Sequence, residues 1–85
     1  MESDDTLVSK LVFYFKDEDT TRRFLLSIKG QKDSDITNIV NHYWEMKAIR
    51  KGTKKTHLWR VLHYAGLYQA RESNWNAMVD FKMKR

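Results

Sequence analysis

The chain contains no cysteine, no proline and only three glycines among its 85 residues. Without cysteine there is no disulfide framework, no thiolate nucleophile and no cysteine-ligated zinc or iron–sulfur site, which fits a reducing compartment. Because roughly four prolines are expected in a chain of this length, their absence favours regular elements joined by short turns. The length allows one domain, which we expect to span residues 1–85, with residues 1–6 flexible.

Long apolar runs are missing as well. The longest run covers residues 11–15, whereas a membrane span needs about 18 apolar residues. Segment 1–5 is acidic, where a secretory signal peptide would be basic. We therefore predict a protein that is cytoplasmic or nucleoid/nuclear, is not secreted and does not bind membranes.

The charge of the chain is basic and unevenly distributed. Sixteen lysines and arginines stand against 11 aspartates and glutamates, a net charge of +5. Residues 1–35 carry a net −2, and residues 36–85 carry a net +7. Most of the N-terminal acids lie where helices are expected to begin, a position that favours carboxylates. Helix C-termini, which favour cations, account for Lys47, Arg50 and Lys51 in the C-terminal excess of bases. The remaining bases fit either a solvated basic face or a surface for an anionic partner.

Hydrophobic periodicity predicts three helices, over residues 18–29, 35–51 and 55–72. Acidic residues precede or open the first two helices, together with threonines in the first and a serine in the second, and glycines follow both, which is typical of helix ends. The third helix has one apolar face toward the core. Its apolar residues are Leu58, Val61, Leu62, Ala65 and Tyr68.

Two strands are expected near the ends of the chain. Strict alternation of apolar and polar residues predicts a strand over 76–83 with one basic face. Segment 7–15 fits a strand by alternation, but Leu7, Leu11 and Phe15 also recur at helical spacing. We prefer the strand, since the second strand needs a partner for its backbone groups. The expected class is α+β, a single small domain of three helices and two short strands, compatible with a helix-turn-helix or winged-helix arrangement.

Groups suited to catalysis or metal binding are sparse. His42 and Glu45 have an i, i+3 spacing that can share a metal, but two ligands are too few for a site. The three glycines stand singly, so there is no glycine-rich loop to cradle a phosphate. We therefore predict a protein that is not an enzyme and has no metal and no cofactor.

A run of basic residues without any acid joins the second and third predicted helices. Lysine ammonium groups beside the N–H groups of a helix start suit a phosphate oxygen, arginine can read base edges, and tryptophan or histidine can stack on a base. We predict a small DNA-binding regulator of transcription, with DNA favoured over RNA, that uses a basic turn-helix over residues 50–63. The predicted site residues are Lys51, Lys54, Lys55, His57, Trp59, Arg60 and His63.

The same helix supports a second hypothesis, a module that binds and modulates a partner protein. Trp59, His63 and Leu67 lie on the face opposite to the expected core, with arginines beside them. Tryptophan and arginine are the residues most enriched at interface hot spots. Two other interpretations remain, namely that the face forms a homodimer interface or that it is buried inside the domain.

Overall fold

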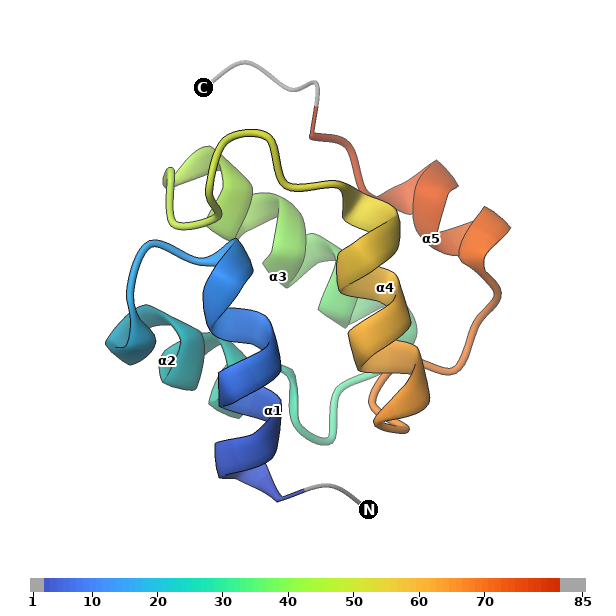
Figure 1. Ribbon diagram of the computed structural model, residues 1–85. Coiled ribbons are helices and arrows are strands. Elements are labelled where there is room, and N and C mark those ends of the chain that lie inside the picture. The colour runs from blue at the N-terminus through green and yellow to red at the C-terminus, as the bar shows by residue number, and fades with distance from the viewer. Residues whose placement is uncertain (1–2, 82–85) are drawn as a thin grey trace.

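Five α-helices and one short 3₁₀ helix make up the computed structural model, which describes residues 3–81 (Figure 1). They are α1 (Asp4–Leu11), η1 (Val12–Tyr14), α2 (Glu18–Ile28), α3 (Asp33–Glu45), α4 (Lys55–Tyr64) and α5 (Glu72–Met78). Contacts run from α1 to α2, α3, α5, α4 and back to α1, so the helices close a ring around one core. Within the described residues there is no β-sheet, and the expected α+β class is therefore wrong.

The first predicted strand, residues 7–15, is a helix that continues into a 3₁₀ turn. The helix begins where the Ser3 hydroxyl accepts a hydrogen bond from the Thr6 N–H at 3.2 Å, and two aspartates stand in its first turn. Leu7 and Leu11, four residues apart, are both buried on the same side. This helical spacing prevails over the alternation, because the cap and the acidic first turn agree with it.

The second predicted strand, residues 76–83, is also wrong over its described part, and residues 82–83 lie outside the described residues. The chain is helical up to Met78 and then continues without a strand partner. The Asn41 side chain takes the place of a pairing strand. Its Nδ2 donates to the Met78 carbonyl at 2.9 Å, and its Oδ1 accepts from the Asp80 N–H at 2.9 Å. One amide side chain thus satisfies both backbone groups.

The helix predicted over 18–29 is confirmed by α2, whereas the helix predicted over 35–51 ends six residues early, at Glu45. Lys47 adopts a left-handed backbone with a φ of 63°, and the Ala48 N–H returns to the Tyr43 carbonyl at 2.9 Å. This is a Schellman ending, which glycine usually forms. A lysine in that position gives no sequence signal, so the early end was missed.

The helix predicted over 55–72 also ends early, because Gly66 adopts a φ of 79° and the Leu67 N–H donates to the Leu62 carbonyl at 3.0 Å. The chain then turns and forms α5, which the sequence did not predict. Residues 46–54 separate α3 from α4, which is longer than the tight turn of a helix-turn-helix. Neither that arrangement nor a winged helix is formed by the described residues.

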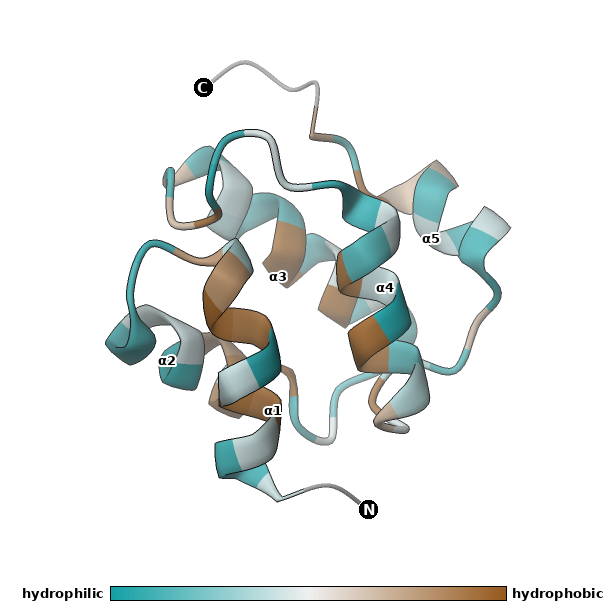
Figure 2. Cartoon of the chain, viewed as in Figure 1, coloured by the Kyte–Doolittle hydropathy of each residue, from teal (hydrophilic) through white to brown (hydrophobic). Residues whose placement is uncertain are grey.

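The core lies inside the ring of helices, where Figure 2 shows apolar residues on the inward sides of α1, α3 and α4. Trp75 and Tyr68 meet edge to face with ring centroids 5.0 Å apart. Burial raises the pKa of the Tyr68 phenol, whose oxygen accepts a hydrogen bond from Asn74 Nδ2 at 2.9 Å. The apolar side chains with no exposed surface are Leu11, Phe15, Phe24, Ile28, Ile36, Val40, Ile49, Leu58, Leu62, Tyr68, Trp75 and Val79.

The start of α2 gives the fold a predictable response to acid. The Asp17 carboxylate accepts a hydrogen bond from the Thr20 N–H at 2.7 Å, and this bond, with a second from the Thr20 side chain, lowers the pKa of Asp17 below its ordinary value of 3.8. Because the folded pKa is the lower one, the stabilisation is complete above the unfolded pKa. It is lost as the pH falls through the folded pKa.

We therefore expect Asp17→Asn, which keeps a capping side chain but cannot titrate, to lose less stability than the wild type on acidification. Urea denaturation of both proteins, followed by circular dichroism between about pH 7 and pH 2, measures the difference. The wild type should be the more stable protein near neutrality, and the gap should close below pH 3.8. A gap of the same size at every pH would contradict the assignment.

Candidate functional site

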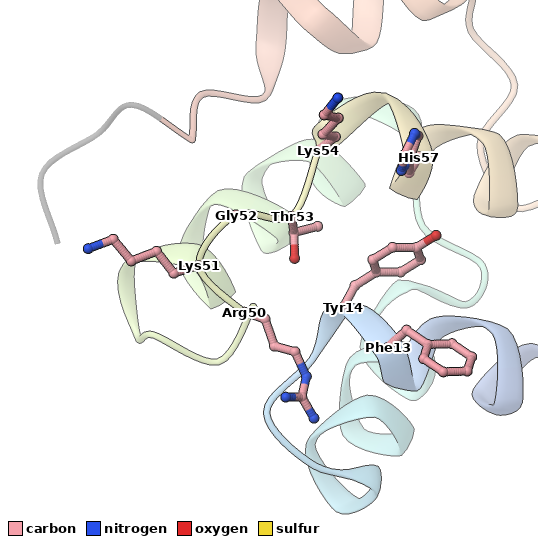
Figure 3. A pocket seen from close by; sticks show the side chains of 8 residues that line it. All are labelled: Phe13, Tyr14, Arg50, Lys51, Gly52, Thr53, Lys54 and His57. Atoms are coloured by element: carbon pink, nitrogen blue, oxygen red, sulfur yellow. The ribbon is translucent and has the colours of Figure 1, made fainter.

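A groove with a volume of about 330 Å³ lies between η1 and the segment that leads into α4. Figure 3 shows the ring of Tyr14 directed toward the side of His57, while the ammonium groups of Lys51 and Lys54 point away from the chain. The lining residues are Phe13, Tyr14, Arg50, Lys51, Gly52, Thr53, Lys54 and His57. The described lining therefore combines cationic, aromatic and small side chains and contains no carboxylate.

Backbone pairing between two distant segments holds the walls of the groove together. Phe15 and Ile49 form an isolated antiparallel bridge, in which the Arg50 N–H donates to the Tyr14 carbonyl at 2.7 Å. The Arg50 side chain adds a further link, because its Nε donates to the Phe15 carbonyl at 2.7 Å. Both bridge residues are fully buried, so this part of the groove is anchored in the core.

The rim of the groove is the turn that starts α4. Gly52 has a φ of 91°, which favours glycine, and the Thr53 N–H donates to the Arg50 carbonyl at 3.1 Å. No side chain caps the N-terminus of α4, at Lys54, and no acid stands in its first turn. Each other α-helix of the described chain has an acidic residue there. The positive end of the α4 dipole thus faces the groove without a carboxylate.

The charged residues around this turn are all basic over a long stretch of sequence. Residues 46–71 contain seven lysines and arginines and no aspartate or glutamate. A second hollow, of about 260 Å³, is lined by Lys16 and Arg23 among others, but Arg23 Nε is paired with the Asp19 carboxylate at 3.1 Å. The groove beside α4 is therefore the stronger candidate for an anionic ligand.

Four of the seven predicted site residues lie on or beside this groove. Lys51, Lys54 and His57 line it, and all three are exposed. Arg60 is exposed as well, and its position three residues after His57 places the two about 60° apart around α4. These residues form a basic strip that leads from the groove along the helix.

The Lys55 ammonium binds to backbone carbonyls outside the groove. Its Nζ donates to the carbonyls of Asn76 and Val79, both at 2.8 Å, at the C-terminal end of α5. A cation at that end satisfies carbonyls that the helix leaves open and complements the helix dipole. Lys55 therefore fastens α5 to α4, and its ammonium is not presented to a ligand.

Trp59 and His63 stack on each other, with ring centroids 4.7 Å apart and planes inclined by 14°. The Trp59 Nε1 donates to the Ala70 carbonyl at 3.1 Å, and His63 Nδ1 lies 3.0 Å from the Tyr68 carbonyl. The ring nitrogens Trp59 Nε1 and His63 Nδ1 thus both bind backbone carbonyls of the loop after α4. Leu67 lies beyond the end of α4 and packs against the core, so the three residues do not form one helix face.

Phe13, Tyr14 and Arg50 complete the groove and were missed as site residues. The sequence of segment 7–15 predicts an element that is covered on both faces, yet Phe13 is 75% exposed. Only the pairing of residue 15 with residue 49 brings η1 beside the basic turn. Apart from the basic run itself, the local sequence contains no signal of that pairing.

The fold and the groove define a small all-helical domain that carries a cationic and aromatic groove. Comparisons with protein-family models, with curated proteins and with solved structures found no match to the chain. Across residues 3–81, no helix is both long and apolar enough to cross a membrane. The same residues bring together no group of three or more histidine, aspartate or glutamate side chains that could hold a metal ion.

Proposed function

We propose that this protein binds nucleic acid, without catalysing a reaction, through the groove beside α4. The observation that carries the proposal is the lining of the groove, where Lys51, Lys54 and His57 stand with two aromatic rings and no carboxylate. Phosphate oxygens are the anions that lysines and an open helix start both suit. The regulatory role and the preference for DNA stay predictions from the sequence.

Lys51 and Lys54 are the phosphate-binding residues in this proposal. Both side chains are exposed, and among the described residues neither ammonium has a hydrogen-bond or ion-pair partner. They are therefore available to displace the counterions that surround a nucleic acid, which is the main source of affinity for a basic surface. Arg60 extends the same surface along α4 toward the next phosphates.

The surface made by α2 and α3 is less suitable for binding nucleic acid than the surface of α4. These helices are joined by residues 29–32, with Gly30 at a φ of 74°. The exposed side of α3, however, carries Asp35 and Glu45. Carboxylates there would repel phosphates, so the charge favours α4 as the binding element.

A protein partner at Trp59, His63 and Leu67 is the second hypothesis from the sequence. All three side chains are partly buried, and both ring nitrogens described above are already engaged. Interface anchors are typically large side chains that stand ready to enter a partner's pocket. The groove, with its exposed cations and aromatic ring, is supported by more observations.

Titration of the full chain into labelled oligonucleotides, followed by fluorescence anisotropy, tests the proposal. Single-stranded and double-stranded DNA and RNA of mixed sequence serve as the ligands. We expect binding whose affinity falls as salt rises from about 50 to 200 mM, with a log–log slope of about 0.7–0.9 per neutralised phosphate. No binding to any of these ligands at low salt, or affinity that does not depend on salt, would overturn the proposal.

A further inference from the structure

We infer that the groove takes an unpaired base of a single-stranded nucleic acid, stacked on Phe13, while the lysines hold the adjoining phosphates. This inference rests on the proposed function and names the form of nucleic acid that the groove suits. Its starting point is that Phe13 is 75% exposed, although apolar rings are usually buried.

The exposure of Phe13 is built into the fold. Leu11 and Phe15, two residues before and after it, are both fully buried, so the backbone of η1 is fixed on either side. The hydrogen bond from the Arg50 N–H to the Tyr14 carbonyl, at 2.7 Å, fixes it further. The ring is thus held outward by a rigid element, which is the condition for a stacking platform.

The position of Phe13 matches the chemistry of a nucleotide. It lines the groove together with Tyr14 on one wall and with Lys51 and Lys54 on the other. A base offers an aromatic face and its phosphate offers a negative charge, so one groove can satisfy both. In a duplex both faces of each base are already stacked on neighbours. An unpaired base is therefore the form that can use the Phe13 ring.

A second exposed ring lies farther along the same strip. Tyr64 is 75% exposed and follows His57 by about two helical turns, which places it about 20° away around α4 and about 10 Å along the axis. Arg60 stands between them on this face. The strip therefore repeats the pairing of ring and cation, as a single strand of several nucleotides requires.

The decisive variant is Phe13→Ala, because the residue is exposed and its removal leaves the core intact. We expect it to weaken the binding of single-stranded oligonucleotides roughly 5- to 150-fold, the range for loss of one stacked base. Binding of an abasic strand of the same length, which keeps the phosphates but has no bases, should not change. Phe13→Leu, which keeps the bulk without the aromatic face, should behave like Phe13→Ala.

Leu26→Ala is the matched control, since Leu26 is 69% exposed and lies on α2 beside Asp4 and Arg22, outside the groove. It should leave the binding of every oligonucleotide unchanged. DNA and RNA strands of one sequence identify which sugar the groove accepts, and either one supports the inference.

The outcomes separate this inference from the proposed function. If duplex binds as tightly as single strand and Phe13→Ala changes neither, the inference is wrong and the proposed function survives. Equal losses on the abasic and the normal strand would also overturn it, since stacking on a base would not be involved. If the wild type binds no nucleic acid at all, both fail.

Discussion

Replacing Lys51 and Lys54 together with alanine is expected to weaken nucleic-acid binding, at about 0.1 M salt, by about 25-fold for a single strand and about 60-fold for a duplex. Both side chains are exposed and line the groove, so their removal takes away two phosphate contacts without opening the core. Each lost contact makes the slope of log affinity against log salt shallower, by about 0.7 for single strands and 0.9 for duplexes. The two proteins should therefore converge near 1 M salt.

The measurement is the salt dependence of affinity for the wild type and the double variant. Because phosphate contacts do not distinguish bases, the loss should be the same for oligonucleotides of different sequence. A slope that the double variant leaves unchanged would show that these lysines do not meet phosphates. A loss confined to one sequence would assign them a different role from the one proposed.

Lys55 provides the control within the same basic run. Its ammonium is bound to the Asn76 and Val79 carbonyls, so Lys55→Met should leave the salt slope as it is in the wild type. The same change should lower the free energy of unfolding by about 1–3 kcal/mol, because two carbonyls lose a charged donor. If Lys55→Met instead reduced the slope like the double variant, the placement of its ammonium would be wrong.

The contrast between Lys54 and Lys55 shows where sequence reasoning reached its limit. Both residues stand at the start of a helix in a run without acids, so both looked suited to phosphate. Only the docking of α5 against α4 distinguishes them. Local charge and the start of α4 were readable from the sequence, whereas contacts between distant segments were not.

The helix α2 and the two predicted strands show the same limit for the fold. α2 could be predicted because its signals are local, with Asp17 as the cap and Gly30 at the end. Segment 76–83 was misread because its alternation is real, but the Asn41 amide supplies the hydrogen bonds that a neighbouring strand would have given. Hydrogen bonds from a distant side chain leave no periodic pattern in the sequence. The period-two alternation alone therefore predicted a strand that does not form.

Trp75→Ala should have the largest effect on stability of any change considered. The side chain has no exposed surface, its Nε1 donates to the Lys55 carbonyl at 2.7 Å, and its ring meets that of Tyr68 at 5.0 Å. Removing a buried tryptophan typically costs about 3–5 kcal/mol. A chain of 85 residues has in total about 4–13 kcal/mol, so a large part of the stability would be lost.

The loss should also reach the groove, because Trp75 and Lys55 fasten α5 and the start of α4 to each other in both directions. Urea denaturation followed by circular dichroism measures the change.

Trp75→Phe keeps a buried ring but leaves the Lys55 carbonyl without its indole donor. Its free energy of unfolding should lie between those of the wild type and Trp75→Ala, about 1–3 kcal/mol below the wild type. Tyr64→Ala removes an aromatic ring that is 75% exposed and should stay within about 0.5 kcal/mol of the wild type. If Trp75→Ala were as mild as Tyr64→Ala, α5 would not be part of the core, and the fixed position of Lys55 would have no support.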